Sequence, residues 1–290
     1  MLVAESGGVY VDATLGACGH ASAILATLGA RGRVIGLDCD PAAVARAEAA
    51  PPAAPPRFRV RRARFSELEP ALAELDAIPV DGILADLGIS STQLDDPARG
   101  LSFLSEGPLD MRLDPSRPLT ADEWIRRADD ATLLRALVEY GELPRPRSVL
   151  AAIRRAAASH RPLTTRALRE ALEPLAPGPA RPRRLAQVFQ ALRIAVNREI
   201  EELEALLDAA PRVVRPGGTF CVIAYHSLED RLVKRAFRPP RPYDPRQQAP
   251  ESPWEPLTRR PLRPGEEECR RNPRARSARL RAARRKEDRP

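Results

Sequence analysis

Apolar residues in the first ninety positions fall into short strand-like runs that are separated by stretches with helical spacing. The strand-like runs cover residues 9–12, 33–38, 58–65 and 80–87, and the helical stretches cover residues 21–28, 42–50 and 66–75. Strands separated by helices of this length predict βαβ units and a parallel sheet.

The alternation stops near Gly88, and from about residue 120 to 176 the pattern is helical only. Thr120 and Glu123 have capping-box spacing where this stretch begins. A Pro- and Gly-rich break follows, and an apolar stripe then predicts one long helix over residues 185–209. Residues 219–225 form an apolar strand, so the α/β pattern resumes there. The simplest architecture is one α/β domain that carries a helical insertion.

Charge is concentrated at the C-terminus. Residues 270–290 contain nine Arg and one Lys but only two acids, Glu287 and Asp288, so the segment has a net charge of +8. This equals the net charge of the whole chain. Such a tail is either a contact for a polyanion or a solvated, partly disordered end. Arg outnumbers Lys 45 to 2, which we attribute to genome composition, so abundant Arg is no argument for RNA binding. Residues 239–264 are expected to be extended or mobile, and residues 277–283 are a candidate final edge strand.

The chain has no apolar run long enough for a membrane span and no signal-peptide pattern at its N-terminus. Its four cysteines, Cys18, Cys39, Cys221 and Cys269, form no CxxC pair. This argues against a zinc site and suits a reducing compartment. We therefore predict a cytoplasmic protein with no membrane contact and no bound metal.

Residues 9–20 predict a cofactor site, because an apolar strand ends there in Asp12 and a glycine-bearing turn leads into a helix. Ligands of open α/β sheets bind at the carboxyl ends of the strands. A dinucleotide fingerprint starting at Gly16 fails, since Cys18 and Ala21 stand where its other two glycines belong. Asp38, at the end of the second strand, is suited to two ribose hydroxyls, and Asp40 is better placed as the helix cap. S-adenosylmethionine suits such a site.

Two further segments follow strand ends at the same sheet edge. Asp86 ends the fourth strand, and methylation of an amine needs acceptors of this kind to orient its N–H groups. Ser90 and Ser91 are more simply interpreted as caps of the neighbouring backbone. After the fifth strand, Ser227 and Asp230 have capping-box spacing, which leaves His226 without a capping role and open to a functional or a structural one.

A dense polar stretch, residues 93–114, has too few apolar positions for a core element. Beside a cofactor site it is either a lid over substrate or cofactor, or a salt-bridged structural loop.

These blocks resemble the MraW family of bacterial methyltransferases, which act on N4 of a cytidine in 16S ribosomal RNA, and the match runs from about residue 7 to 284. The blocks that carry it are Asp12-Ala-Thr-Leu-Gly with Gly19-His20, Asp38-Cys-Asp-Pro41, Asp81-Gly-Ile-Leu-Ala-Asp-Leu-Gly-Ile-Ser-Ser, Arg99-Gly-Leu-Ser-Phe, Pro108-Leu-Asp-Met-Arg-Leu-Asp114, Phe189-Gln-Ala-Leu-Arg-Ile-Ala-Val-Asn197, His226-Ser-Leu-Glu-Asp-Arg231 and Asn272-Pro-Arg-Ala-Arg-Ser277.

The resemblance implies a class I, Rossmann-like methyltransferase domain over residues 1–104 and 184–290 and an inserted helical substrate-binding domain over residues 105–183. It also implies S-adenosylmethionine as methyl donor and 16S rRNA, in the small ribosomal subunit or its assembly intermediate, as acceptor. Monomer and homodimer both stay open. The cofactor contacts that it implies are Cys18, Gly19, His20, Asp38, Phe65, Asp86 and Gln93. We expect Asp86 or His226 to handle the proton, and Arg99, Asp110, Arg112 and Asn197 to bind substrate.

The chain departs from the family pattern at a few positions. Cys18 stands where the family has glycine, which would cost stability or affinity if the turn needs a positive φ. Tyr225 replaces the usual Phe, and Leu143 replaces a common Glu. The usual segment ahead of the first strand is not in this sequence, so either Met1 is a misassigned start or the sheet lacks some covering structure. Two rival functions remain: methylation of an amine in another RNA or in DNA, and a catalytically impaired ribosome-assembly or RNA-binding factor.

Overall fold

A computed structural model describes residues 2–175, 177–239 and 251–287 and divides the chain into two compact units. The first unit comprises Met1–Gly88 and Glu201–Pro290, and the second comprises Ile89–Ile200. Each unit has a hydrophobic core of its own, so each is described separately.

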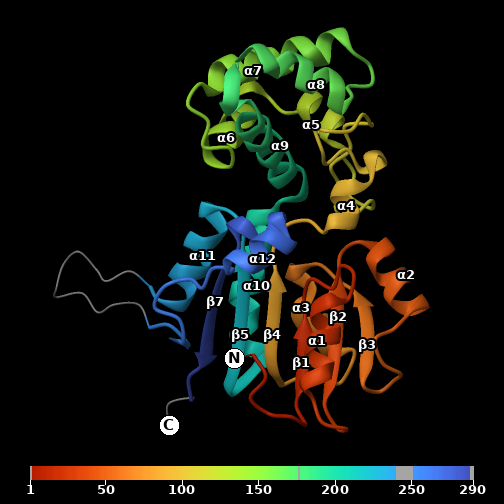
Figure 1. Ribbon diagram of the computed structural model, residues 1–290, viewed down its shortest axis with the longest axis vertical. Coiled ribbons are helices and arrows are strands. Elements are labelled where there is room, and N and C mark those ends of the chain that lie inside the picture. Colours follow the sequence, from red (N-terminus) through yellow and green to blue (C-terminus); the bar gives the residue numbers. More distant parts are fainter. Residues whose placement is uncertain (1, 176, 240–250, 288–290) are drawn as a thin grey trace, which may run out of the picture. The chain divides into compact units, whose positions relative to one another are not determined.

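The first unit is built on a seven-stranded sheet of order β3-β2-β1-β4-β5-β7-β6 (Figure 1). The strands are β1 (Val9–Asp12), β2 (Arg33–Asp38), β3 (Phe58–Arg62), β4 (Val80–Asp86), β5 (Val214–Ala224), β6 (Trp254–Pro256) and β7 (Arg279–Arg285). Strands β1 to β5 are parallel, and β7 runs antiparallel between β5 and β6. The predicted α/β class with a parallel, Rossmann-like sheet is confirmed.

Helices cover both faces of this sheet, because successive strand residues point to opposite sides. The helices of the first unit are α1 (Gly19–Thr27), α2 (Pro41–Ala49), α3 (Leu68–Ala73), α10 (Glu199–Val213), α11 (Ser227–Phe237) and α12 (Glu266–Arg271), with short 3₁₀ turns η1 (Phe65–Glu67) and η5 (Pro273–Ser277). Val11 and Ile83 lie in one core cluster with α3, α10 and α11. Tyr10 and Leu84, one residue away in each strand, lie in another cluster with α1.

Two strand predictions need correction. Residues 277–283 were expected to form an edge strand, but β7 is internal because Trp254–Pro256 pairs with its outer side. The third strand is shorter than predicted and ends at Arg62, and Phe65 begins the turn η1. Of the stretch expected to be extended, residues 240–250 lie outside the described residues, and β6 occupies part of the remainder.

The second unit is helical. Its elements are α4 (Ser91–Asp95), η2 (Pro97–Arg99), α5 (Ala121–Arg127), α6 (Asp130–Glu139), α7 (Pro146–Ser159), α8 (Thr165–Leu172), η3 (Glu173–Leu175), η4 (Gly178–Ala180) and α9 (Arg181–Asn197). It is wider at both ends than the predicted insertion over residues 105–183. The reason is that Leu101 and the apolar face of α9, including Leu185 and Leu192, belong to its hydrophobic core.

The single long helix predicted over residues 185–209 is wrong, since α9 and α10 are separate helices. Arg198 adopts a left-handed conformation between them, with φ of 53°. The apolar stripe continues through the break, which is why the sequence pattern conceals it. Within the described residues, every helix is too short or too polar to cross a membrane.

Candidate active site

Asp12, the last residue of β1, is a buried carboxylate at the carboxyl edge of the sheet. Its Oδ1 accepts a hydrogen bond from Thr14 N at 3.2 Å, and within the described residues its buried Oδ2 has no hydrogen-bond partner. Burial raises the pKa of Asp12 to about 6, and the charges of His20, Asp86 and Asp38 act on it as well. An unsatisfied buried oxygen here fits a ligand that brings a donor or a cation.

The turn after β1 leads into α1 through two left-handed residues, Gly16 with φ of 50° and Cys18 with φ of 64°. Cys18 is the N-cap residue of α1 but makes no side-chain cap, and its N–H donates to Leu15 O at 2.7 Å. Cys18 thus holds the positive φ that favours glycine, at a cost of roughly 1 kcal/mol, without breaking the turn. A Cβ built on Gly19 would meet no atom within 4 Å, so this side of the turn is open.

Asp38 ends β2 and is held by the backbone of two loops. Its Oδ2 accepts from Gly16 N at 2.9 Å, and its Oδ1 accepts from Asp40 N at 2.9 Å. Burial raises the pKa of Asp38. Asp40 caps α2 by accepting from Ala42 N at 3.0 Å, so the prediction that Asp40 is the helix cap is confirmed. Each Asp38 oxygen keeps a second lone pair, which suits a pair of ligand hydroxyls.

Asp86 ends β4, and partners from three other segments hold it in place. Its Oδ1 accepts from the Tyr225 hydroxyl at 3.0 Å, and its Oδ2 lies 3.2 Å from His20 Nε2. Asp86 N donates to Thr14 Oγ1 at 2.7 Å. The hydrogen bond to Asp86 raises the pKa of His20, while burial and then Asp86 raise the pKa of Tyr225. The carboxylate is therefore oriented while each oxygen retains capacity for one more donor.

His226 has the capping role that the sequence assigned to Ser227, which is a correction. It is the N-cap residue of α11, and its Nδ1 lies 3.5 Å from Glu229 N. Its Nε2 lies 3.1 Å from Glu229 Oε1 without hydrogen-bond alignment, and Glu229 Oε2 accepts from His226 N and from Tyr225 N. Serine is the commoner cap, so local preference placed the box one residue late. Among the described residues no hydrogen bond joins His226 to Asp86.

The structure places the other predicted cofactor residues in both units. Phe65 is half-buried in η1 and packs against the core of the first unit, just after Ala63, whose N–H donates to Asp38 O at 3.0 Å. Gln93 belongs to the second unit and completes a capping box on α4, where its Oε1 accepts from Ser90 N at 2.9 Å. The interpretation of Ser90 as a cap is confirmed.

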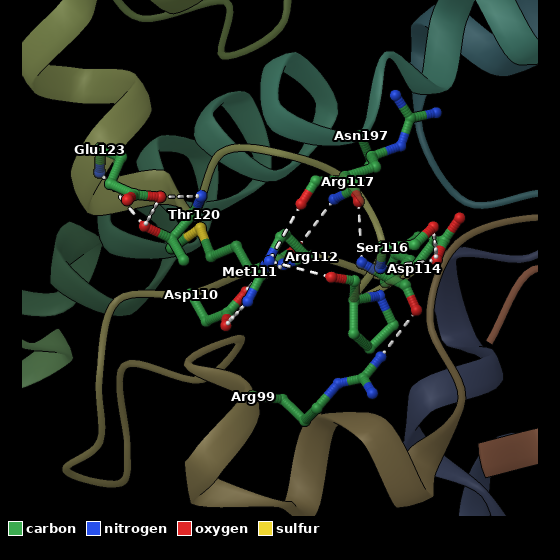
Figure 2. A network of polar contacts seen from close by, with 12 residues as sticks. Arg99, Asp110, Met111, Arg112, Asp114, Ser116, Arg117, Thr120, Glu123 and Asn197 are labelled. Atoms are coloured by element: carbon green, nitrogen blue, oxygen red, sulfur yellow. Dashed lines mark hydrogen bonds and ion pairs between the residues drawn. The ribbon is translucent and has the colours of Figure 1, made fainter. Parts of the chain in front are cut away.

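The four predicted substrate-binding residues meet in one polar network of the second unit (Figure 2). Arg112 forms a two-pronged ion pair with Asp110, both contacts at 2.8 Å, and its Nη1 donates to the carbonyls of Pro115 and Arg117 at 2.9 Å. Burial by itself raises the pKa of Asp110, but the hydrogen bonds from Arg112 outweigh it and lower that pKa below its ordinary value. Of the two interpretations of residues 93–114, the network supports the salt-bridged loop.

Asn197 and Arg99 connect this loop to its surroundings (Figure 2). The buried Asn197 amide accepts from Leu113 N at 2.8 Å and donates to Met111 O at 2.7 Å. Arg99 Nη2 donates to Leu113 O at 2.9 Å. Because Met111 has φ of 61°, these contacts fix a loop conformation that its side chains alone do not favour.

Sequence reasoning missed Thr14 and Tyr225 as residues of the first-unit site, and it named Asp12 as the carboxylate that ends the first strand without assigning a contact to it. The Asp12-Ala-Thr segment lay inside the motif that proposed the site, so its position at a strand end was an available signal. Nothing local in the sequence predicts the Tyr225 contact, because the Tyr225 and Asp86 side chains meet across 139 residues of chain.

A sheet of this order, with one antiparallel strand inserted beside β5 and acids ending β1, β2 and β4, defines a class I methyltransferase. The chain belongs to the MraW methylase family, which it matches over residues 1–286. The cofactor of this family, and so of this protein, is S-adenosylmethionine.

Relatives with the same printed name align over nearly the whole chain. Ribosomal RNA small subunit methyltransferase H of Sorangium cellulosum (strain So ce56) is 53% identical over 283 residues, covering 97% of this chain and 85% of that protein. The protein of that name from Synechococcus sp. (strain JA-2-3B'a(2-13)) is 46% identical over 292 residues, covering 96% and 86%. Among solved structures, an rRNA methylase from Streptococcus thermophilus aligns at 8% identity with a TM-score of 0.40, covering 98% of this chain and 89% of that chain.

Proposed function

We propose that the protein transfers a methyl group to N4 of a cytidine in 16S ribosomal RNA of the small subunit, in its decoding region. The relatives that share its family are named for small-subunit ribosomal RNA, which supports the substrate. The observation that carries the chemistry is Asp86, an acceptor held by Tyr225 and His20 at the sheet edge that also presents Asp12 and Asp38.

The residues of the first unit fit the methyl donor. S-adenosylmethionine, when bound, supplies an electrophilic methyl group on sulfur. We assign its ribose hydroxyls to Asp38, whose two oxygens are fixed by backbone N–H groups. The unpaired Asp12 Oδ2 suits its ammonium group, and the open turn at Cys18, Gly19 and His20 leaves room for the amino-acid moiety. Phe65 is assigned to the adenine, and Gln93 remains a predicted contact.

Asp86 is the group that we assign to the acceptor amine. A carboxylate oxygen of Asp86 accepts a hydrogen bond from an N–H of the exocyclic amine, and this bond aligns the nitrogen lone pair for in-line attack. The same carboxylate then receives the proton that the amine loses. Tyr225 and His20 keep this carboxylate in one orientation. The imidazole of His226 faces Glu229 of its own helix, so Asp86 is the better candidate for the proton.

In this proposal Arg99, Asp110, Arg112 and Asn197 act by fixing the conformation of the salt-bridged loop over residues 93–114. Arg112 directs four N–H groups at protein acceptors, and the Asn197 side chain is committed to the backbone of Met111 and Leu113. Replacement of these residues is therefore expected to act by disordering the loop and not by removing a direct contact with the cytosine base.

The test is methyl transfer from labelled S-adenosylmethionine to small ribosomal subunits from a strain that lacks this gene. Digestion of the 16S RNA and mass spectrometry should show a new N4-methylcytidine, absent with Asp86→Asn. Label on DNA or on another RNA, with unchanged 16S cytidines, would replace the substrate assignment. Subunit binding without methyl transfer would favour an assembly factor. Calorimetry of S-adenosylmethionine binding to the Asp38→Ala variant tests the cofactor site separately. An unchanged affinity would reject the assignment of the ribose hydroxyls to Asp38.

A further inference from the structure

Several arginines of the basic C-terminal segment are committed to holding the fold. The buried Arg281 donates to both carboxylate oxygens of Asp230 in α11, at 2.7 and 3.2 Å. Arg285 Nε donates to a backbone carbonyl of α10 at 2.6 Å, and Arg271 pairs with Glu267 within α12. Arg281 and Arg285 therefore stabilise β7 and are not available to a ligand, whereas the Arg271–Glu267 pair is exposed and balances charge within α12.

The register of β7 separates the remaining charges onto opposite edges of the sheet. Arg279 pairs with Ala224, at the carboxyl end of β5, next to the residue that pairs with Asp86. Arg284 pairs with Thr219, five residues back along β5. At roughly 3.3 Å per residue, the two arginines are about 17 Å apart along the strand direction. Only the beginning of β7 is therefore on the side of the candidate active site.

The segment before β7 lies at the same carboxyl edge. Leu262 and Leu280 exchange two backbone hydrogen bonds of 2.9 Å, and α12 and η5 follow directly in the chain. The charge of Glu268 in α12 acts on the pKa of Tyr225, so α12 is close to the Tyr225–Asp86 pair. Figure 1 shows α12 at the end of the sheet toward which β4 points.

Four arginines at this edge are open to a partner, and we call them the edge arginines. The side chains of Arg263, Arg270 and Arg276 are exposed and form no hydrogen bond or ion pair within the described residues. Arg279 is 3.7 Å from Asp230, whose oxygens Arg281 already occupies. Residues 263–279 contain six arginines and three glutamates, and one of these glutamates is neutralised by Arg271.

We propose that the edge arginines bind backbone phosphates of the RNA strand that flank the target nucleotide. The proposal rests on an RNA substrate at Asp86. A nucleotide that presents its base to Asp86 carries phosphates on both sides, and contacts to phosphate set the position of a strand without selecting its sequence. Guanidinium groups beside the site supply such contacts, whereas Arg284, of equal charge, is too distant.

The test compares two triple variants that remove the same charge from opposite edges. The first combines Arg263→Ala, Arg270→Ala and Arg276→Ala. The control combines Arg31→Ala, Arg284→Ala and Lys286→Ala, all exposed positions at the amino edge. A third variant carries lysine at the three edge positions, because lysine keeps the charge that attracts a phosphate.

RNA binding is measured by fluorescence anisotropy with a short single-stranded RNA across a salt series. The KM of methyl transfer is measured with undermethylated small subunits as substrate. Each lost phosphate contact reduces the slope of log K against log salt by about 0.7, so the edge variant should lose about 2 units of slope. We expect its KM to rise by about tenfold or more at about 0.1 M salt, with the control unchanged and the lysine variant largely restored.

Equal slopes for the edge variant and the control, or equal losses in both, would overturn the proposal. Affinity for S-adenosylmethionine should not change in any of the three variants, which confirms that the fold is retained. If the unmodified protein methylates no subunits, the proposed function fails, and the anisotropy comparison still decides whether this edge binds RNA.

Discussion

Replacing Asp12 by asparagine is expected to stabilise the unliganded protein at neutral pH while weakening its binding of S-adenosylmethionine. Asp12 is fully buried, and Oδ2 lacks a partner within the described residues. Burial raises the pKa from 3.8 to about 6. At 1.36 kcal/mol per pKa unit, the ionised carboxylate costs the folded protein about 3 kcal/mol above that pH.

The sign follows from proton binding. Because the folded pKa lies above that of the unfolded chain, the folded protein holds the Asp12 proton more tightly. The contribution of Asp12 to the stability of the native protein should therefore fall as pH rises from about 4 to about 6, and level off above. The asparagine side chain of the Asp12→Asn variant has no charge to bury and retains an oxygen for Thr14 N. The stability of the variant relative to the native protein should therefore increase by about 3 kcal/mol over the same interval.

Ligand affinity should change in the opposite direction. An ammonium group facing Oδ2 forms a charge-assisted hydrogen bond, and such bonds contribute roughly 1.5–3 kcal/mol. Its loss should weaken the binding of S-adenosylmethionine by roughly tenfold to a hundredfold. The same side chain would then limit stability and support function.

Urea unfolding at a series of pH values measures the stability difference, and calorimetry at about pH 8 measures affinity. Asp76→Asn is the control, since Asp76 is exposed in a turn and its replacement should give a difference that does not vary with pH. A pH-independent difference for Asp12→Asn would refute the argument from buried charge. Unchanged affinity would show that Oδ2 does not face the cofactor.

Three further predictions concern the turn, the loop and the Asp86 cluster. Cys18→Gly should be about 1 kcal/mol more stable than Cys18→Ala, because only glycine relieves the positive φ; equal unfolding midpoints would contradict this. Asn197→Ala should cost about 2–4 kcal/mol, because the backbone of Met111 and Leu113 loses buried partners; unchanged hydrogen exchange at Leu113 would exclude that cause. In Asp86→Asn, NMR titration should show a lower pKa for His20 than in the native protein. Tyr225→Phe is the control, because it keeps the His20–Asp86 hydrogen bond that raises this pKa. A His20 pKa that stays raised in Asp86→Asn would show that Asp86 is not the cause.

Local sequence signals predicted several helix caps correctly. Asp40 was predicted correctly as the cap of α2, because a residue just before Pro41 at a helix start is a recognisable cap. The Thr120–Glu123 capping box was also correct. These caps are formed by residues within one helical turn of each other, so they can be predicted directly from the sequence.

Two helix ends were predicted wrongly, the first for a local reason and the second because of a distant partner. The sequence placed the α11 cap at Ser227, but Glu229 binds backbone N–H groups of Tyr225 and His226 and moves the cap to His226. The break at Arg198 was missed because Asn197 ends its helix through contacts with a loop more than eighty residues away.

The sequence by itself determined the class of the protein, because strand and helix periods, cap residues and family blocks are all written locally. Only the tertiary structure decided which groups share a site. It joined Tyr225 and His20 to Asp86, left Asp12 Oδ2 buried without a partner among the described residues, and divided the basic tail between two edges of the sheet. The physical reason is that strand register and burial arise from contacts between segments that are distant in the sequence. A shift of one residue in strand pairing would change which charged side chains are neighbours.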